Sequence, residues 1–230
     1  MNGYGVIFDM DGVLVDSYQA HYHSWLQTAQ RYGLSMNETD FKRTFGRTSR
    51  EIIGQLWPGR FNDQQIREFD AIKEKAYRDV LLRQFPAMDG VGELLEQLAR
   101  AGFALAIGSS GPPENVALAR RLLPNGDLIG VTVDGSEVQH GKPDPQVFLT
   151  AARKLSLPPG CCAVVEDAPV GIEAARRAGM TAIAITGTVG RDALARRAHI
   201  VVDSLRQLTP KLIEDAIRTA GQALAAQSPK

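Results

Sequence analysis

An Asp-x-Asp pair, Asp9 and Asp11, directly follows a short apolar run at residues 4–8. Two carboxylates separated by one residue in a tight turn, which Gly12 permits, can point toward one ligand. Together they can bind a hard divalent cation through oxygen, or act as nucleophile and general acid. The structural alternative is an acidic turn in solvent, and the pair by itself does not decide between the two interpretations.

A second acidic pair, Glu166 and Asp167, follows another apolar run at residues 161–165. Paired acids at the end of a buried strand are unfavourable unless they bind a cation or accept hydrogen bonds. This pair is therefore a second source of candidate metal ligands. In the structural alternative, Asp167 is the N-cap of a helix that carries Pro169 in its first turn.

Two further segments carry residues suited to binding phosphate. Ser109 and Ser110 stand in a Gly-Ser-Ser-Gly-Pro-Pro sequence, where hydroxyl groups, backbone N–H groups and a helix N-terminus favour an anion. Lys142, in a Gly-Lys-Pro-Asp-Pro sequence, offers a point charge to a phosphate or to a carboxylate nucleophile. Each segment also has an ordinary interpretation, a helix N-cap for the first and a solvated lysine for the second.

Short apolar runs without alternation predict the strands that would position these residues. Such runs are typical of strands buried on both faces of a parallel sheet. They lie at residues 4–8, 103–107, 128–133, 161–165, 181–185 and 200–202. Helical periodicity separates the runs from residue 85 onward, which predicts an α/β core with a Rossmann-like, doubly wound parallel sheet. Ligands of such sheets gather at the carboxyl ends of strands, where both acidic pairs and the serines are found.

The stretch from residue 17 to about residue 83 breaks this alternation of strand and helix. Apolar and aromatic residues recur there at helical spacing, and no convincing strand is found. A connection of roughly 70 residues is far longer than an ordinary link between a strand and a helix. We therefore predict an α/β core of residues 1–16 and 86–230, interrupted by an inserted α-helical cap of residues 17–85.

Composition and charge exclude several classes of protein. The 230 residues carry 26 Lys and Arg against 26 Asp and Glu, which argues against a disordered tail protein and against non-specific nucleic-acid binding. The two cysteines, Cys161 and Cys162, are adjacent, so they predict no disulfide framework and fit a reducing compartment. Neither a signal peptide nor an apolar run of membrane-spanning length is found. We expect a cytoplasmic monomer that binds neither nucleic acid nor membrane.

Taken in order, the four segments give the chain a resemblance to a known family. It resembles the haloacid dehalogenase (HAD) superfamily of aspartyl-phosphate phosphotransferases. Within that superfamily it is most similar to the group of β-phosphoglucomutase and phosphoglycolate phosphatase, which carries a helical cap between the first and second motifs. The resemblance covers nearly the whole chain. Its motifs are residues 8–17 (FDMDGVLVDS), 108–110 (GSS), 141–145 (GKPDP) and 166–172 (EDAPVGI).

The resemblance implies a role for each motif residue. Asp9 would attack phosphorus in line and become an aspartyl phosphate. Asp11 would protonate the leaving oxygen and then take a proton from the hydrolytic water. Ser109 and Lys142 would hold the phosphoryl oxygens. The implied cofactor is Mg²⁺, with the ligands Asp9, Asp11 (through its backbone carbonyl), Asp167 and, directly or indirectly, Glu166.

The resemblance also implies substrate contacts from the cap and from the loop after Ser109. His21 and Arg50 fall where a mutase carries its cap histidine and cap arginine. A mutase has a Lys-Asn pair shortly after its motif serine, whereas Pro112 and Pro113 stand here. Packing of the histidine and solvation of the arginines remain the alternatives. The candidate substrate-binding residues are His21, Arg47, Arg50, Ser110 and Asn115.

From these observations we expect a Mg²⁺-dependent phosphatase that acts on a small phosphorylated metabolite, a sugar phosphate or a short-acid phosphate, through an aspartyl phosphate. Asp11 favours phosphoryl transfer over dehalogenation, because the dehalogenases of the superfamily lack this second carboxylate. A β-phosphoglucomutase-like mutase that uses the same intermediate is the main alternative. A non-enzymatic phospho-accepting module is a more remote one, against which the large helical insertion argues.

Overall fold

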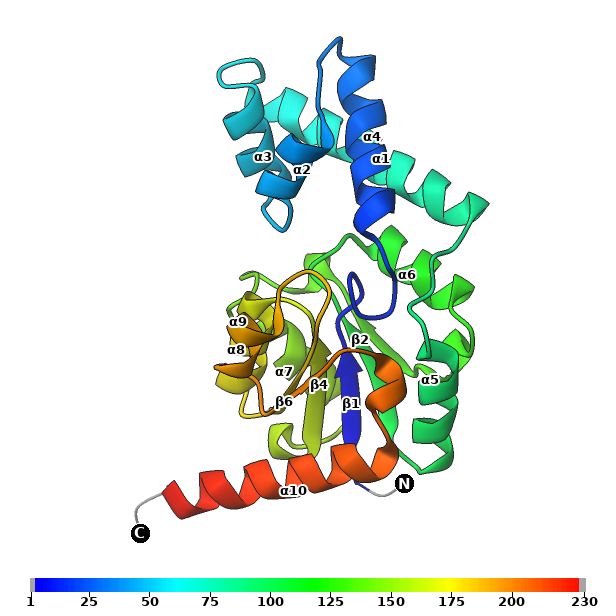
Figure 1. Ribbon diagram of the computed structural model, residues 1–230, viewed down its shortest axis with the longest axis vertical. Coiled ribbons are helices and arrows are strands. Elements are labelled where there is room, and N and C mark those ends of the chain that lie inside the picture. Colours follow the sequence, from blue (N-terminus) through cyan, green and yellow to red (C-terminus); the bar gives the residue numbers. More distant parts are fainter. Residues whose placement is uncertain (1–2, 228–230) are drawn as a thin grey trace. The chain divides into compact units, whose positions relative to one another are not determined.

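A six-stranded parallel sheet forms the centre of the α/β part of the chain (Figure 1). The computed structural model describes residues 3–227, and the side chains of its last helix as far as Gln222. In spatial order the strands are β3 (Val131–Val133), β2 (Ala104–Gly108), β1 (Gly5–Phe8), β4 (Cys162–Glu166), β5 (Thr181–Ile185) and β6 (Ile200–Val202). This is the order of a doubly wound, Rossmann-like sheet, so the predicted fold class is confirmed.

Helices cover both faces of this sheet. They are α5 (Val91–Arg100), α6 (Pro113–Leu122), α7 (Gln146–Lys154), α8 (Pro169–Arg177), α9 (Arg191–Ala195) and α10 (Pro210–Gln227). Buried side chains such as Ile7, Phe148 and Ile172 join α7, α8 and α9 to one face. Because side chains alternate along a strand, Val6 and Phe8 point to the other face, where α5 contacts β2 and α10 contacts β4 and β5.

One predicted strand is too long. The apolar run at residues 128–133 predicts a strand throughout, but β3 comprises only Val131–Val133. A 3₁₀ turn occupies Gly126–Leu128, and the side chain of Leu128 is exposed. Apolar composition alone does not separate a turn that carries a leucine from the strand that follows it.

Four helices and the loops between them form the second part of the chain, which lies between β1 and α5. Contacts divide the chain into two compact units, one of residues 1–16 and 87–230 and one of residues 17–86, which we call the helical unit. Its helices are α1 (Tyr18–Arg31), α2 (Glu38–Thr44), α3 (Ser49–Leu56) and α4 (Asp63–Arg83). The aromatic side chains of Trp25, Phe41 and Phe69 lie in its buried core.

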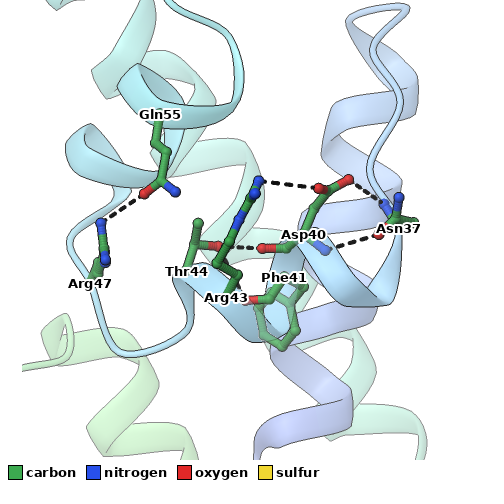
Figure 2. Close-up of polar contacts among 7 residues, drawn as sticks. All are labelled: Asn37, Asp40, Phe41, Arg43, Thr44, Arg47 and Gln55. Atoms are coloured by element: carbon green, nitrogen blue, oxygen red, sulfur yellow. Dashed lines mark hydrogen bonds and ion pairs between the residues drawn. The ribbon is translucent and has the colours of Figure 1, made fainter.

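Capping boxes fix where the later helices of this unit begin. At the start of α2, the Asp40 N–H donates to the Asn37 side chain, and the Asp40 carboxylate accepts from the Asn37 N–H (Figure 2). Thr48 and Asn62 serve as N-caps in the same way at α3 and α4. Each box provides acceptors for two backbone N–H groups that have no partner within the helix, and a cap of this kind is worth about 1 kcal/mol.

The helical unit is inserted at a single junction of the core. Val15, before the insertion, forms an antiparallel bridge with Ala87, after it. Beside this bridge, the Met88 N–H donates to the Leu14 carbonyl at 3.0 Å. The chain therefore leaves the core and returns to it at neighbouring positions.

Two other sequence predictions concern cysteines and membranes. Cys161 and Cys162 are both free thiols. Over the described residues 3–227, the helices are too short or too polar for any of them to span a bilayer.

An imidazole completes the hydrogen bonding between β5 and β6. His199 donates its backbone N–H to the Ala182 carbonyl (2.8 Å), and its Nδ1 accepts the Ala182 N–H (2.9 Å). Ala182 is buried, so its N–H depends on this acceptor. Burial of the imidazole lowers the pKa of His199, and the positive charge of Arg176 lowers it further.

We expect protonation of His199 to destabilise the folded protein. Its folded pKa lies below the ordinary value of 6.5, so as the pH falls the unfolded chain binds the proton first. This contribution to the free energy of unfolding is therefore present above about pH 6.5 and is lost progressively below it. His199→Asn places an oxygen acceptor where Nδ1 stands and does not titrate.

Urea denaturation of both proteins between pH 8 and pH 5 measures this effect. The difference in midpoint should shift in favour of the Asn variant as the pH falls. Other titrating groups act on both proteins alike, so a difference that stays constant with pH would contradict the role of His199.

Candidate active site

The carboxyl ends of β1 and β4 bring three carboxylates together. Phe8 pairs with Val165 in the register of the two strands, and the Asp9 N–H donates to the Val165 carbonyl at 3.0 Å. Asp9 is thus held beside the end of β4, where Glu166 is the last residue of the strand and Asp167 is the next residue of the chain. One oxygen from each of these carboxylates lies within 4.8 Å of the others, and the three residues are 8%, 1% and 6% exposed.

A buried ammonium group faces two of these carboxylates. The Nζ of Lys142 lies 2.6 Å from Asp9 Oδ1 and 2.6 Å from Glu166 Oε1. It also lies 4.9 Å from the centre of the Phe148 ring, and its side chain is 9% exposed. The other oxygen of Glu166 accepts the Ala168 N–H at 2.7 Å. Both oxygens of Glu166 are therefore engaged within the protein.

The charges of this cluster do not balance by themselves. Burial raises the pKa of Asp9 to about 7, because the attraction of Lys142 offsets only part of the cost of burying its charge. Burial, followed by the negative charges of Glu166 and Asp9, raises the pKa of Asp167 well above its usual range. Burial alone would lower the pKa of Lys142, but the two carboxylates that it contacts outweigh burial and raise it.

This imbalance fits a divalent cation. Three ionised carboxylates against one ammonium leave two negative charges uncompensated in a buried space. A group of carboxylate oxygens is also the donor set that hard divalent cations such as Mg²⁺ prefer. On charge and on donor chemistry, Asp9, Glu166 and Asp167 can therefore hold a divalent metal ion.

Asp11 lies in the turn after Asp9 and is half-buried. Its carboxylate is not one of the three that converge, and its backbone forms a bridge with Val15. The next residue, Gly12, has a φ of +76°, and a Cβ there would collide with the Asp167 carboxylate. Both the left-handed backbone and this close approach require glycine in the turn.

The predicted phosphate-binding loop begins where β2 ends. Ser109 is buried, its N–H donates to the Val133 carbonyl (3.0 Å), and its Oγ accepts the Gly111 N–H (3.0 Å). Because β2 is the neighbour of β1, Ser109 lies at the same edge of the sheet as Asp9. Ser110 is exposed, whereas Asn115 is buried in α6.

The predicted cap histidine packs within the helical unit. The His21 ring stacks on the Tyr77 ring at 4.2 Å between centres, and it lies 6.1 Å from the Phe45 ring. These contacts agree with the packing alternative, and a substrate role for His21 stays a prediction.

The two arginines of the unit also have partners inside it. Arg47 donates to the Gln55 side chain at 2.7 Å, as Figure 2 shows, and Arg50 forms an ion pair with Asp63 at 2.7 Å. The ion pair is largely exposed, so it holds Arg50 only weakly. Substrate binding by either arginine likewise stays a prediction.

Two residues of the site, Thr188 and Gly171, had no predicted role. Thr188, in the loop after β5, donates its hydroxyl to Asp167 Oδ2. At Gly171, in α8, an added Cβ would overlap the Glu166 carboxylate. Gly171 lies inside the fourth motif, so its type and place were visible. Thr188 carried only the weaker signal of a hydroxyl residue after a strand next to β4.

Comparison with known proteins relates this arrangement to characterised ones. The family model of haloacid dehalogenase-like hydrolases matches residues 5–179. The chain is 32% identical over 200 residues to validoxylamine A 7'-phosphate phosphatase of Streptomyces hygroscopicus subsp. limoneus. The matched region covers 86% of this chain and 92% of that protein. It is 30% identical over 217 residues to β-phosphoglucomutase of Bacillus subtilis (strain 168), with 91% and 93% covered.

Among solved structures, the chain is similar to a HAD hydrolase, family IA, variant 3, from Entamoeba histolytica HM-1:IMSS. The TM-score is 0.85 at 25% sequence identity, and the likeness covers 94% of this chain and 99% of that chain.

Alanine at Gly171 should destabilise the protein, although helix propensity predicts the opposite. Inside a helix, replacing glycine by alanine normally stabilises by about 0.5–1 kcal/mol. Here the new Cβ would displace the Glu166 carboxylate from both Lys142 and Ala168. We expect Gly171→Ala to lower the free energy of unfolding by about 1–3 kcal/mol.

Gly221→Ala is the matched control, because Gly221 lies in α10 of the same unit and, among the described residues, its added Cβ would contact nothing within 4 Å beyond the backbone of its own helix. It should be neutral or stabilising in the same urea denaturation experiment. Equal effects of the two substitutions would argue against the close approach of Glu166 to Gly171.

Proposed function

Because the chain belongs to the haloacid dehalogenase-like hydrolase family, we propose that it hydrolyses the phosphate ester of a small metabolite, a sugar phosphate in the first place, with Mg²⁺ as cofactor. Membership confirms the resemblance drawn from the four motifs, and the chain is an enzyme of the HAD phosphatase and phosphotransferase type. The single observation that carries the proposal is the buried cluster in which Lys142 joins Asp9 to Glu166. The substrate class is supported by relatives whose names describe phosphorylated compounds.

Asp9 is the proposed nucleophile. Its oxygen attacks phosphorus in line, and the bond between phosphorus and the ester oxygen breaks as the aspartyl phosphate forms. Water then attacks phosphorus, the bond to the Asp9 oxygen breaks, and inorganic phosphate leaves with the carboxylate restored. The ammonium of Lys142, 2.6 Å from Asp9, offsets the negative charge that would repel an incoming phosphate dianion.

Asp11 is the proposed general acid and base. It gives a proton to the leaving ester oxygen in the first step and takes one from the attacking water in the second, so it ends in its starting state. Its place two residues after the nucleophile, in the turn that Gly12 closes, supports this division of roles. Ser109, together with Lys142, is proposed to hold the phosphoryl oxygens.

The proposed ligands of the divalent cation are the carboxylates of Asp9 and Asp167 and the backbone carbonyl of Asp11. Glu166, with both oxygens engaged by the protein, would add negative charge beside the ion and hold Lys142 in place. The cation, when bound, supplies positive charge to the phosphoryl oxygens and lets Asp9 and Asp167 ionise together.

The helical unit is the proposed cap. A lid of this kind excludes bulk water from the aspartyl phosphate and supplies substrate contacts, here from His21, Arg47 and Arg50. The ion pair of Arg50 with Asp63 is largely exposed, so the guanidinium group can exchange this weak partner for an oxygen of a substrate. The junction at Val15 and Ala87 is the proposed hinge.

Removing the nucleophile should abolish turnover without unfolding the protein. Asp9→Asn keeps the shape of the side chain and an oxygen that can accept from Lys142, but it cannot form the aspartyl phosphate. We expect release of phosphate from p-nitrophenyl phosphate in Mg²⁺ to fall by a factor on the order of 10³ or more. Asp127→Asn, an exposed aspartate of the same unit, is the control and should keep full activity. Full activity of Asp9→Asn would refute the mechanism.

The fate of the phosphoryl group separates hydrolysis from isomerisation. The 30% identity to β-phosphoglucomutase favours a mutase as the second candidate, whereas Pro112 and Pro113 in the loop after Ser109 argue against its sugar contacts. The enzyme is incubated with β-glucose 1-phosphate and a bisphosphate primer, and with a panel of sugar phosphates. We expect the enzyme to release inorganic phosphate from at least one sugar phosphate of the panel. Glucose 6-phosphate without net release of phosphate would instead establish the mutase.

A further inference from the structure

The loop between β5 and α9, residues 186–190, is anchored at both of its ends. At the start, the Thr186 N–H donates to the Val202 carbonyl and its hydroxyl donates to Asp203 Oδ1, both at 2.9 Å. At the end, Arg191 donates to Asp203 Oδ2 at 2.6 Å. Asp203 therefore ties both ends of the loop to the segment after β6, and the middle of the loop is held near the carboxyl end of the sheet.

From the middle of this loop, Thr188 contacts the acid cluster. Its hydroxyl donates to Asp167 Oδ2, and this same oxygen is the atom nearest to where a Cβ on Gly12 would lie. One oxygen of Asp167 is thus enclosed by the Gly12 turn and the Thr188 hydroxyl. Thr188 itself is exposed, so its methyl group adds little to the packing of the core.

We propose that Thr188 is a positioning residue for the divalent cation: its hydroxyl holds one oxygen of Asp167 and leaves the other to bind the ion. This inference rests on the cation site of the proposed function. A terminal carboxylate otherwise rotates over a broad range, and ordering it when the ion binds weakens affinity. A hydrogen bond that fixes the carboxylate beforehand removes that cost, and partners of metal ligands typically contribute 10–100-fold to metal affinity or activity.

Isothermal titration calorimetry of the metal-free protein with MgCl₂ tests this role of Thr188. Thr188→Val keeps the size and shape of the side chain but lacks the hydroxyl, and we expect it to raise the Kd for Mg²⁺ by about 10–100-fold. Thr188→Ser restores the hydroxyl and should bind within a few-fold of the wild type. Because Thr188 is exposed, the Tm of the metal-free protein should be the same in all three proteins.

Steady-state kinetics supply an independent measurement. In Thr188→Val, the Mg²⁺ concentration for half-maximal activity should rise, while the KM for the phosphate ester at saturating Mg²⁺ should stay unchanged. A purely structural role of Thr188 would instead lower the Tm and would not be rescued by serine.

Two outcomes would overturn the assignment while leaving the proposed function intact: Mg²⁺ binding by Thr188→Val as tight as by the wild type, or failure of Thr188→Ser to restore binding. If the wild type itself does not bind Mg²⁺, the cation site of the proposed function is wrong, and the role of Thr188 falls with it.

Discussion

Negative charge concentrated in a small buried space governs the architecture around this site. Three carboxylates converge there because β1 and β4 are neighbours in register, Asp9 follows β1, and Glu166 and Asp167 stand at the end of β4. Like charges that are this close and shielded from water repel strongly, so the fold must supply compensation. Lys142 provides part of it by reaching two of the acids from the loop before α7. The remaining negative charge is not compensated by Lys142, and a bound cation would be stabilised by it.

Two glycines make this concentration of carboxylates sterically feasible. Gly12 and Gly171 lack the Cβ atoms that would displace Asp167 and Glu166, respectively.

Compensation of the negative charge is local. The chain as a whole has equal numbers of acidic and basic residues, so attraction of a phosphate depends on charges at the site and not on the net charge of the protein. The aromatic core of the helical unit, by contrast, is built from ring contacts among residues such as Trp25, Phe41 and Phe69.

Much of this arrangement could be predicted from the sequence, since the apolar runs, the order of the motifs and the gathering of ligands at the carboxyl ends of parallel strands act together. The apolar runs before Asp9 and Glu166 located two strands of a parallel sheet, so both acids were expected at the same edge of the sheet. That these two strands are neighbours is a finding of the structure. Contacts that depend on distant loops could not be predicted in this way. Thr188 sits in a loop without a motif, and the Arg50–Asp63 pair joins side chains 13 residues apart on two helices whose packing no local pattern encodes. The β3 boundary was wrong because apolar content does not report backbone dihedral angles.

The junction at Val15 and Ala87 bears on how such a protein diversifies. The chain departs from and returns to the core at paired positions, and β1 pairs with β2 and β4, so the register of β1 involves no residue of the insertion. A module attached in this way can be lengthened, repacked or exchanged over evolutionary time while the catalytic scaffold folds as before. Under the proposed function, substrate contacts from the helical unit and chemistry at the acid cluster can thus be inherited separately.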